Sequence, residues 1–402
     1  MYRSNRRTLD RLRLVVLFGG RSAEHDVSCV SARHVVTAAD PEKYLIEPIG
    51  ITRTGQWVQA LEAHEALSAG PGALGERLSA TGPRIDPFAA LSGTGGRDSA
   101  AGGPDAEPSA AEPARAGDPD CVVLPILHGP MGEDGTVQGL LELAQVPYAG
   151  ASVLASALCM DKAATKAMLS AAGVAQTRWL SVTLDDPSAD DLRLGPILDT
   201  VEGALGLPVF VKPASMGSSI GITKAATRSE AAAGLRLACR YDRSIVVEQP
   251  CAAREIEVAV LGNETLEASL PGEIIPGSDF YDYADKYQDG AELLVPAPLS
   301  DSEIRACQDL AVTACRAMGV EGLARVDFLY EDGRCGRGDR GWLVNELNTM
   351  PGFTPISMYP KLWSASGLDY PRLIDRLVEL AMQRHQRRRR HSSTNAPAPA
   401  SE

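Results

Sequence analysis

Two carboxylates and a carboxamide near the end of the chain could hold a divalent cation. Asp327 lies in one segment of strand character, and Glu346 and Asn348 lie in the next, after a polar, glycine-rich turn. Side chains alternate between the two faces of a strand, so Val344 is expected on the face of Glu346. If the segments pair, Asp327 faces Glu346 and Asn348. Such hard oxygen donors suit Mg²⁺, although a hairpin with a solvated polar face fits these residues as well.

A loop of small residues is a candidate phosphate site. It follows Lys212 and contains Gly217, Ser218 and Ser219. Small side chains allow close backbone approach, and hydroxyl and N–H groups can donate to phosphate oxygens. Lys212 could reach the same phosphates as a point charge. The loop lacks the GxxxxGK[ST] spacing, which excludes a P-loop, and an ordinary hairpin turn remains the alternative.

Two polar residues follow buried-strand patterns in the N-terminal part of the chain. The apolar run from Leu14 to Phe18 ends in two glycines, and Glu24 lies just before a helical pattern. Glu24 suits an ammonium group, although a helix-capping acid is an equally simple interpretation. His128 follows a second apolar run, where open α/β sheets bind ligands, but a structural loop histidine is also possible. The missing GxGxxG spacing disfavours a dinucleotide site.

Charged residues also mark the middle of the chain. Asp161 is a plausible N-cap of a helix that carries Lys162 and Lys166 one turn apart. Lysines with this spacing are expected to be solvated. Glu255 and Glu257 alternate with apolar residues in a strand pattern. They could accept hydrogen bonds from ribose hydroxyls or form an exposed strand edge.

Composition limits the class of protein. The 402 residues carry a net charge of −13, which argues against nucleic acid as the main partner. The eight cysteines are scattered without CxxC spacing, as expected for reduced thiols in a cytosol rather than for zinc or disulfides. We expect no signal peptide and no membrane span, which needs ~20 apolar residues.

Three segments stand apart from this pattern. Residues 62–119 are rich in Ala, Gly, Pro and Ser, which predicts a disordered surface insertion. Residues 280–287, FYDYADKY, are unusually aromatic and predict a lid that folds over a site and excludes water. Residues 387–402 begin with several arginines and are expected to form a disordered, solvated tail.

Taken together, the motifs resemble those of the D-alanine–D-alanine ligases, a family of the ATP-grasp superfamily. They occur in the family's order over most of the chain, which makes the resemblance specific although each motif alone is weak. The matching stretches are VVLFGGRSAEHDVS, HGPMGEDGTVQGLLELAQVPYAG, ALCMDKAATK, VFVKPASMGSSIGI, VVEQPCAAREIEVAV, FYDYADKY, RVDF and VNELNTMPGFTPISMYP.

The resemblance implies an α/β protein with the three-domain ATP-grasp ligase architecture. An N-terminal parallel α/β domain, residues 1–157, would be followed by two α+β domains that sandwich ATP. Their expected bounds are 158–244 for the central subdomain and 245–386 for the C-terminal one. The implied reaction joins two D-alanine molecules through a D-alanyl phosphate, for peptidoglycan precursor synthesis in the cytoplasm of a bacterium. A homodimer is implied as well, with no nucleic-acid or membrane partner.

The family's functional residues map onto matching positions of this chain. Two Mg²⁺ (or Mn²⁺) ions would be held by Asp327, Glu346 and Asn348, with Glu346 bridging. ATP would be bound by Lys162, Lys212, Ser219, Glu248, Cys251, Glu255 and Lys286. The catalytic set would be Glu24, Ser218, Tyr287, Arg325 and the backbone N–H of Gly352. The two alanines would also contact His128, Ser357 and the backbone near Met358.

Acceptor choice and alternative functions depend on a few positions. By resemblance, relatives that make D-alanine–D-lactate carry His where this chain has Tyr287, so Tyr287 favours D-alanine. Met358 replaces a leucine that many members carry, which leaves the finer preference open. A D-lactate or D-serine variant, a non-catalytic nucleotide-binding protein and an NAD-dependent oxidoreductase are the alternatives. The presence of Asp327, Glu346 and Lys212 argues against a non-catalytic protein.

Overall fold

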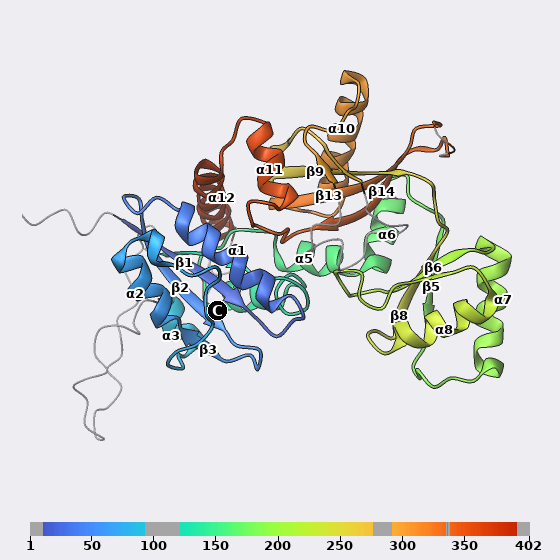
Figure 1. The fold of residues 1–402 in the computed structure, drawn as a ribbon, viewed down its shortest axis with the longest axis horizontal. Helices are drawn as coiled ribbons and strands as arrows, with labels where there is room; N and C mark the ends of the chain where they lie inside the picture. Colours follow the sequence, from blue (N-terminus) through green and yellow to red (C-terminus); the bar gives the residue numbers. More distant parts are fainter. Residues whose placement is uncertain (1–10, 93–120, 276–291, 335, 337, 392–402) are drawn as a thin grey trace, which may run out of the picture. The chain divides into compact units, whose positions relative to one another are not determined.

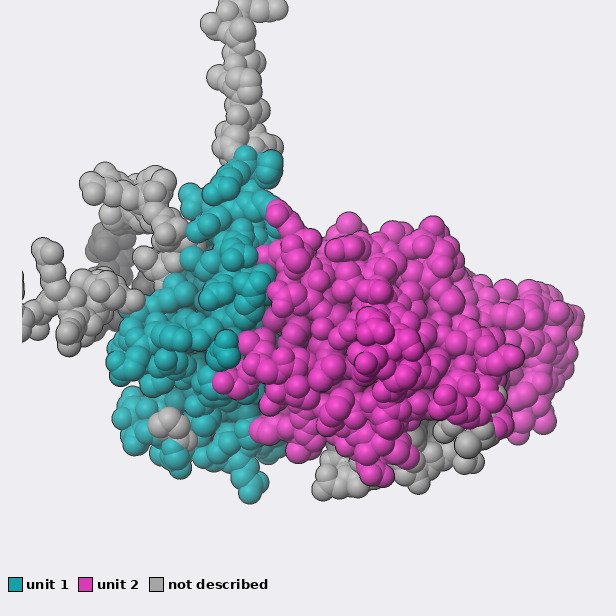
Figure 2. Space-filling model, turned by 90° about the horizontal axis from the view of Figure 1, so that it is seen from above, with its two compact units in different colours: residues 1–128, 136–150, 370–402 teal, residues 129–135, 151–369 magenta. Residues whose placement is uncertain are grey.

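The computed structural model describes residues 11–92, 121–275, 292–334, 336 and 338–391 (Figure 1). The chain divides into two compact units (Figure 2). The first consists of residues 1–128, 136–150 and 370–402, and the second of residues 129–135 and 151–369. Both mix helices and strands, as the α/β prediction requires. None of the described helices is long and apolar enough to cross a membrane.

Among its described residues, the first unit contains one sheet with helices around it. Its described elements are β1 (Leu12–Gly19), α1 (His25–Ala38), β2 (Tyr44–Ile51), β3 (Trp57–Gln59), α2 (Leu61–Ala69), the 3₁₀ helix η1 (Pro71–Ala73), α3 (Pro87–Ser92), β4 (Cys121–Ile126), α4 (Thr136–Leu143) and α12 (Tyr370–Arg390). The described strands are ordered β3-β2-β1-β4. β1 runs parallel to both neighbours, whereas β3 is antiparallel to β2. The predicted parallel N-terminal sheet is therefore confirmed.

The turn after β1 explains why two glycines end this strand. β1 is buried from Leu14 onwards, as the continuous apolar run predicted. Gly19 and Gly20 have φ values of 93° and 99°, which favour glycine. A Cβ on Gly19 would lie 2.2 Å from the carbonyl oxygen of Ile51 on the neighbouring strand. The turn can therefore follow the strand so closely only with glycine at this position.

The last helix packs in the first unit. The buried guanidinium of Arg384 donates to the carbonyl oxygens of Tyr148, at 2.7 Å, and of Gly150. The Tyr44 hydroxyl on β2 donates to Asp375 on α12 at 2.8 Å. Although we expected this helix in the C-terminal subdomain, α12 groups with the first unit because of these contacts. It also runs to Arg390, so the predicted disordered tail does not begin at residue 387. The predicted domain boundaries otherwise remain predictions.

Part of the predicted insertion has regular structure. Residues 62–92 include nearly all of α2 and the whole of α3, and Leu78 and Leu91 are buried. The guanidinium of Arg13 on β1 bonds the carbonyl oxygens of Ala90 and Leu91, which holds α3 against the strand. The disorder expectation is wrong for this half, because a few leucines supply a core that average composition conceals. Residues 93–120 lie outside the described residues.

The described part of the second unit contains two sheets. Its described elements before residue 250 are α5 (Val153–Met160), α6 (Lys162–Ala171), β5 (Trp179–Thr183), α7 (Asp191–Leu205), β6 (Val209–Pro213), β7 (Thr223–Ala225), α8 (Arg228–Cys239) and β8 (Ser244–Glu248). Strands β5-β8-β6-β7 form an antiparallel sheet whose core is shared with α7 and α8. As predicted, Asp161 is the N-cap of α6, and its side chain accepts from the amide of Ala164 at 2.9 Å.

The larger sheet follows along the chain. Its described elements and their helices are β9 (Arg254–Gly262), β10 (Leu266–Ala268), β11 (Gly272–Ile275), β12 (Glu292–Leu294), α10 (Asp301–Ala317), β13 (Gly322–Glu331), β14 (Gly341–Asn348) and α11 (Met358–Ala365). The described strands are ordered β12-β11-β9-β13-β14, with β10 beside β9. β9 is thus an interior strand, so Glu255 and Glu257 do not form an exposed edge.

A β-bulge in the β13–β14 pair corrects one sequence expectation. Asp327 pairs with Glu346, but Phe328 pairs with Val344, so β14 contributes one extra residue. Val344 consequently turns into the apolar core beside Phe328, whereas Glu346 keeps its place opposite Asp327. The prediction that Val344 shares a face with Glu346 is therefore wrong, because simple alternation does not account for a bulge.

Candidate active site

Three carboxylates lie side by side on neighbouring strands of the larger sheet. Asp327 on β13 pairs with Glu346 on β14 and with Glu257 on β9. The prediction that Asp327 faces Glu346 is thus confirmed. Asn348 pairs with Arg325 instead, two residues along the same strand from Glu346. We call Glu257, Asp327 and Glu346 the acidic row.

Arg325 lies against the acidic row. Its Nε and Nη2 atoms both donate to the carboxylate of Asp327, at 2.7 Å each, and Nε lies 3.1 Å from Glu257 Oε2. Burial opposes its positive charge, but Asp327 and Glu257 outweigh this effect and raise the pKa of Arg325. The fork geometry explains why an arginine occupies this place, because a lysine ammonium cannot make two parallel hydrogen bonds.

Lys162 links the acidic row to the loop between β6 and β7, residues 214–222, which we call the glycine-serine loop. Its Nζ atom lies 3.8 Å from Glu346 Oε2 and donates to the carbonyl oxygen of Met216 at 2.5 Å. Its backbone N–H also donates to Ala214 at 3.0 Å. Lys162, the first residue of α6, thus contacts Glu346 on the larger sheet and the backbone of the glycine-serine loop. Its ammonium group lies between the acidic row and this loop.

The donor chemistry of the row suits a divalent metal. Among the described residues, no three His, Cys, Asp or Glu side chains are arranged as a ready metal site. Asp327 and Glu346 nevertheless supply carboxylate oxygens on paired positions, and Asn348 supplies a carboxamide nearby, which are the ligands Mg²⁺ takes. Arg325 and Lys162 contact these acids. Such contacts compensate carboxylate charge that a cation would otherwise balance.

A second charged cluster lies at the end of β8. The carboxylate of Glu248 accepts from Lys212 on β6 at 3.0 Å and lies 3.2 Å from the ammonium of Lys166 on α6. The Thr177 hydroxyl donates to the same carboxylate at 2.9 Å. We call these four residues the Glu248 cluster. Lys166 is 1% exposed, which corrects the expectation of a solvated lysine, because β8 presents Glu248 to this face of α6.

The charges of the cluster are strongly coupled. Burial alone would raise the pKa of Glu248, but Lys212 and Lys166 outweigh it and lower the pKa to about 2. Burial lowers the pKa of Lys166, while the neighbouring Glu248 carboxylate opposes that change. Glu248 is therefore an anion at neutral pH, and its two lysine partners give the cluster an excess of positive charge.

The glycine-serine loop has an unusual backbone. Ser218 and Ser219 have φ values of 50° and 59°, which is uncommon for residues with a side chain. Such strain clusters at functional sites, and successive turned peptides make concave anion-binding surfaces. The loop joins β6, which carries Lys212, to β7. The phosphate-site prediction is thus supported by the backbone of the loop and by the strand that delivers the lysine.

The segment after β14 places the predicted acceptor residues together. Ser357 is the N-cap of α11, and its Oγ atom accepts from the amide of Thr354 at 3.1 Å. A Cβ on Gly352 would lie 2.8 Å from this oxygen, so a side chain at position 352 would displace Ser357. Met358 is buried, and its sulfur would meet a Cβ on Gly272 at 2.8 Å.

The remaining predicted residues are distributed over both units. Glu255 lies on β9 between β11 and β13, and Cys251 lies just before β9. Burial, followed by the charge of Glu331, raises the pKa of the Cys251 thiol to about 11. Lys286 and Tyr287 of the predicted aromatic lid lie outside the described residues.

Glu24 and His128 belong to the first unit, at the ends of β1 and β4 respectively. Both side chains are buried, at 9% and 6% exposure. Glu24 is the N-cap residue of α1, yet its side chain makes no capping hydrogen bond. The carboxylate thus lies at the helix N-terminus, where the helix-capping interpretation places it, and the ammonium-binding role stays a prediction. Parallel strands place both residues at the same edge of the sheet.

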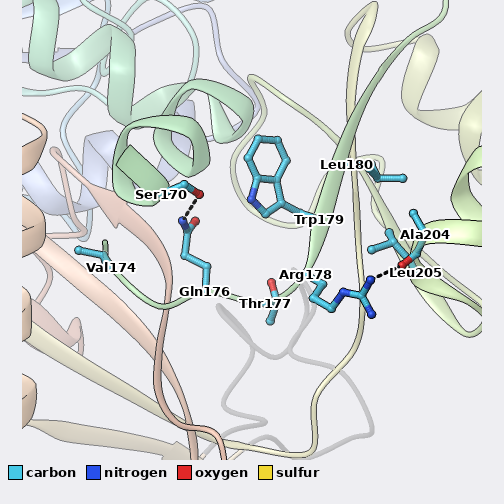
Figure 3. Close-up of a pocket in the computed structure, with 9 residues that line it drawn as sticks. All are labelled: Ser170, Val174, Gln176, Thr177, Arg178, Trp179, Leu180, Ala204 and Leu205. Carbon is cyan, nitrogen blue, oxygen red and sulfur yellow. Dashed lines mark hydrogen bonds between the residues drawn. The ribbon is translucent and has the colours of Figure 1, made fainter. Parts of the chain in front are cut away.

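A pocket of about 370 Å³ lies beside the Glu248 cluster in the second unit (Figure 3). Ser170, Gln176, Trp179 and Leu205 are among its lining residues, and Gln176 donates to the hydroxyl of Ser170 at 3.1 Å. None of the predicted site residues that the structure describes lines it. Thr177 lines the pocket and also donates a hydrogen bond to Glu248, so it connects the pocket to the Glu248 cluster.

Sequence reasoning missed three residues of these two clusters. Glu257 was considered only for a ribose or an exposed edge, Lys166 was expected to be solvated, and Thr177 was not considered. The available signal was the spacing of Lys162 and Lys166, which places both on one face of α6. Their burial depends on tertiary packing against β8, which spacing alone does not reveal.

Comparisons with solved structures define the class. The chain matches the D-alanine–D-alanine ligase from Coxiella burnetii with a TM-score of 0.73 and 34% identity, covering 95% of this chain and 98% of that one. It matches the VanG D-Ala:D-Ser ligase from Enterococcus faecalis with a TM-score of 0.70 and 30% identity, covering 92% and 99%. The fold is therefore that of an ATP-grasp-type ligase.

Sequence comparisons define the family. The models for the D-ala D-ala ligase N-terminus and C-terminus match residues 13–151 and 168–379. A D-alanine–D-alanine ligase from Thermoanaerobacter sp. is 43% identical over 94% of this chain and 98% of the relative. Another from Kineococcus radiotolerans is 46% identical over 92% and 97%. The chain belongs to the D-alanine–D-alanine ligase family.

Proposed function

We propose that this protein is an ATP-dependent D-alanine–D-alanine ligase that supplies the dipeptide for peptidoglycan precursors. One D-alanine carboxylate oxygen takes the γ-phosphoryl group of ATP, which yields D-alanyl phosphate and ADP. The amine of a second D-alanine then attacks the acyl carbon, loses a proton and expels phosphate. The observation that carries the proposal is relatedness over nearly the whole chain, with Asp327 opposite Glu346 at the predicted metal position.

Asp327 and Glu346 of the acidic row, together with Asn348, are proposed to hold two Mg²⁺ or Mn²⁺ ions, with Glu346 shared. When bound, such ions neutralise charge on the transferring phosphoryl group. Lys162 supports the arrangement because its ammonium already lies 3.8 Å from Glu346. It would contribute positive charge on the nucleotide side of the row.

ATP is proposed to contact the cation-rich part of the same unit. Lys212 and Ser219 would bind phosphates, and Lys286 would add a further ammonium group. Glu255 would accept from the ribose hydroxyls, and Glu248 and Cys251 would line the adenine pocket. The proposal is supported by the excess positive charge of the Glu248 cluster and by the turned backbone at Ser218 and Ser219.

Binding and activation of D-alanine are proposed to use the positions that match the family's catalytic residues. Glu24 would hold the first ammonium group in a network with Ser218 and Tyr287, and His128 would help at this site. Arg325 has five N–H donors, and those not engaged by Asp327 would stabilise the tetrahedral oxyanion.

The acceptor carboxylate would be held close to the second oxyanion donor. Gly352 would contribute its backbone N–H to the oxyanion, next to Ser357 and the N-terminus of α11, including the backbone near Met358. A Cβ on Gly352 would lie 2.8 Å from Ser357 Oγ, and this proximity supports a common role for the two residues. Phosphoryl transfer and amide formation then need mainly positioning and charge stabilisation.

Acceptor specificity is proposed to favour D-alanine through Tyr287. A histidine at this position can carry a positive charge and disfavour an ammonium-bearing acceptor. Tyr287→His is therefore expected to shift preference towards D-lactate, measured as the ratio of kcat/KM for the two acceptors. An unchanged ratio would count against this role of the lid segment.

The protein is further proposed to act as a homodimer in the cytoplasm, where ATP is available. Family membership supports both statements. Light scattering at several protein concentrations tests the first, with a mass of twice the 42.5 kDa chain expected. A mass of one chain at all concentrations would contradict it.

Phosphate release with ATP, Mg²⁺ and a panel of D-alanine, L-alanine, D-lactate and D-serine tests the main proposal. We expect release with D-alanine alone, together with D-alanyl-D-alanine in the product mixture. Faster release with D-alanine plus D-serine than with D-alanine as the sole amino acid, with D-alanyl-D-serine as the product, would favour a ligase of the kind represented by the Enterococcus faecalis neighbour. No release with any of the four would contradict the proposal.

A further inference from the structure

We infer that Lys166 is a positioning residue for the nucleotide phosphates, because it balances the charge of Glu248 and thereby leaves the charge of Lys212 available to an anion. The inference rests on the proposed nucleotide site and adds a residue to it. Lys166 itself lies too deep to touch a ligand, since its side chain is 1% exposed. Lys212, at 13% exposure, is the more accessible of the two.

The geometry divides the two oxygens of Glu248 between its partners. Oε1 lies 3.0 Å from Lys212 Nζ, whereas Oε2 lies 3.2 Å from Lys166 Nζ and accepts from Thr177 at 2.9 Å. Lys166 and Thr177 also contact one another at 3.4 Å. Lys212 can therefore turn away from Oε1 while the opposite oxygen keeps an ammonium group and a hydroxyl.

Charge explains why this division matters. A buried carboxylate that loses its cation pays a large desolvation penalty, since removal of one partner of a buried pair leaves an uncompensated charge. If Lys212 were the sole cation at Glu248, phosphate binding would have to break that pair. With Lys166 in place, Glu248 remains paired, and the cluster has two positive groups for one negative group. The surplus charge then lies on Lys212, the member that a phosphate can reach.

The surrounding elements reinforce this assignment. Lys166 is in α6, Glu248 in β8, Lys212 in β6, and Thr177 in the segment that leads into β5. Glu346 on β14 adds a weaker attraction for Lys166, whereas Lys212 repels it. Four separate segments therefore meet at one carboxylate, so the pairing of Lys166 with Glu248 depends on the packing of α6 against the antiparallel sheet.

ADP and adenosine affinities of Lys166→Met test the inference, because only ADP carries phosphates. Methionine fills a similar volume without charge. We expect ADP to bind about tenfold more weakly to the variant, a loss of about 1.4 kcal/mol, because Glu248 would then hold Lys212 as its remaining cation. Adenosine should bind within about twofold of wild type. Lys224→Met, a change of an exposed lysine on β7, serves as the matched control and should alter neither affinity.

A double-variant cycle separates this role from a general packing role. Once Glu248→Gln has removed the negative charge, adding Lys166→Met should change ADP affinity by less than about twofold. This pair stays informative even if Lys166→Met alone does not fold, because no uncompensated carboxylate remains in it. A tenfold difference in ADP affinity between the Glu248→Gln protein and the double variant would overturn the inference.

Other outcomes are equally decisive. Unchanged ADP affinity in a folded Lys166→Met protein would overturn the inference, as would equal weakening of ADP and adenosine, which is the result of distorted packing. If the wild-type protein binds ADP but shows no ligase activity, the proposed function fails while the inference stands. If it binds no nucleotide at all, both fail.

Discussion

The acidic row and the Glu248 cluster belong to the same unit but carry opposite excesses of charge. Glu257, Asp327 and Glu346 are accompanied by two cations, Arg325 and Lys162. Glu248 is accompanied by Lys166 and Lys212. The first group is thus short of positive charge and the second has a surplus. The sign of the excess charge determines the kind of ligand that each region can bind. The acidic row suits a divalent cation, and the Glu248 cluster suits a phosphate.

Removal of the arginine from the acidic row should have the largest effect. Arg325→Met would leave Asp327 and Glu257 without the fork that satisfies them, and such a loss typically costs about 3–5 kcal/mol. Urea unfolding should show a decrease of that size in the free energy of unfolding. Arg316→Met, at an exposed position of α10, is the control and should change little. A decrease of less than about 1 kcal/mol in the free energy of unfolding would show that Arg325 is not needed to offset the repulsion among the carboxylates of the acidic row.

Neutralising the shared metal ligand should mainly affect turnover. Glu346→Gln keeps the shape of the side chain but removes its charge, and we expect phosphate release to fall at least about 100-fold, since metal charge stabilisation contributes several kcal/mol. Glu267→Gln on the exposed face of β10 should stay within twofold of wild type. A near-normal rate for Glu346→Gln would refute the metal assignment.

The Glu248 cluster should reveal itself at low pH. Its folded pKa of about 2 lies below the ordinary value of 4.5, so its stabilisation is complete above that ordinary value and is lost as the pH falls towards 2. Between pH 6 and pH 3, wild type should lose about 2 kcal/mol more unfolding free energy than Glu248→Gln. Parallel curves for the two proteins would show that the lysines do not lower the pKa of this carboxyl group.

The smallest expected effect concerns the hydroxyl in the cluster. Thr177→Val removes one hydrogen bond to Glu248 without changing charge, so we expect a loss of about 1 kcal/mol in the free energy of unfolding. ADP affinity should stay within about twofold, because Lys166 still balances the carboxylate. Thr313→Val on the exposed face of α10 is the matched control. A tenfold loss of ADP affinity would assign the positioning role to the hydroxyl rather than to the ammonium group.

The two clusters also differ in how far sequence could predict them. The pairing of the strands that carry Asp327 and Glu346 is a local feature, because only residues 332–340 separate β13 from β14. The burial of Lys166 could not be predicted in this way. Two lysines one turn apart on a helix give the same sequence pattern whether they face solvent or a buried carboxylate. Only the packing of α6 on β8 decides between them.

The fold shows the same division between local and tertiary information. The buried strand β1, its glycine turn and the N-cap of α6 were predictable from short patterns. The bulge that sends Val344 into the core was not, because it depends on the register of two strands. Residues 62–92 were misassigned because Leu78 and Leu91 supply a core within a segment of otherwise disorder-prone composition.

Binding of Mn²⁺, followed by electron paramagnetic resonance in the presence of ADP, tests the charge contrast most directly. Wild type is expected to bind Mn²⁺ in the ADP complex, and Glu346→Gln should bind it at least tenfold more weakly. Lys166→Met, assayed at saturating ADP, should match wild type. Equal Mn²⁺ affinity in wild type and Glu346→Gln would contradict the division of the two regions into a metal site and a phosphate site.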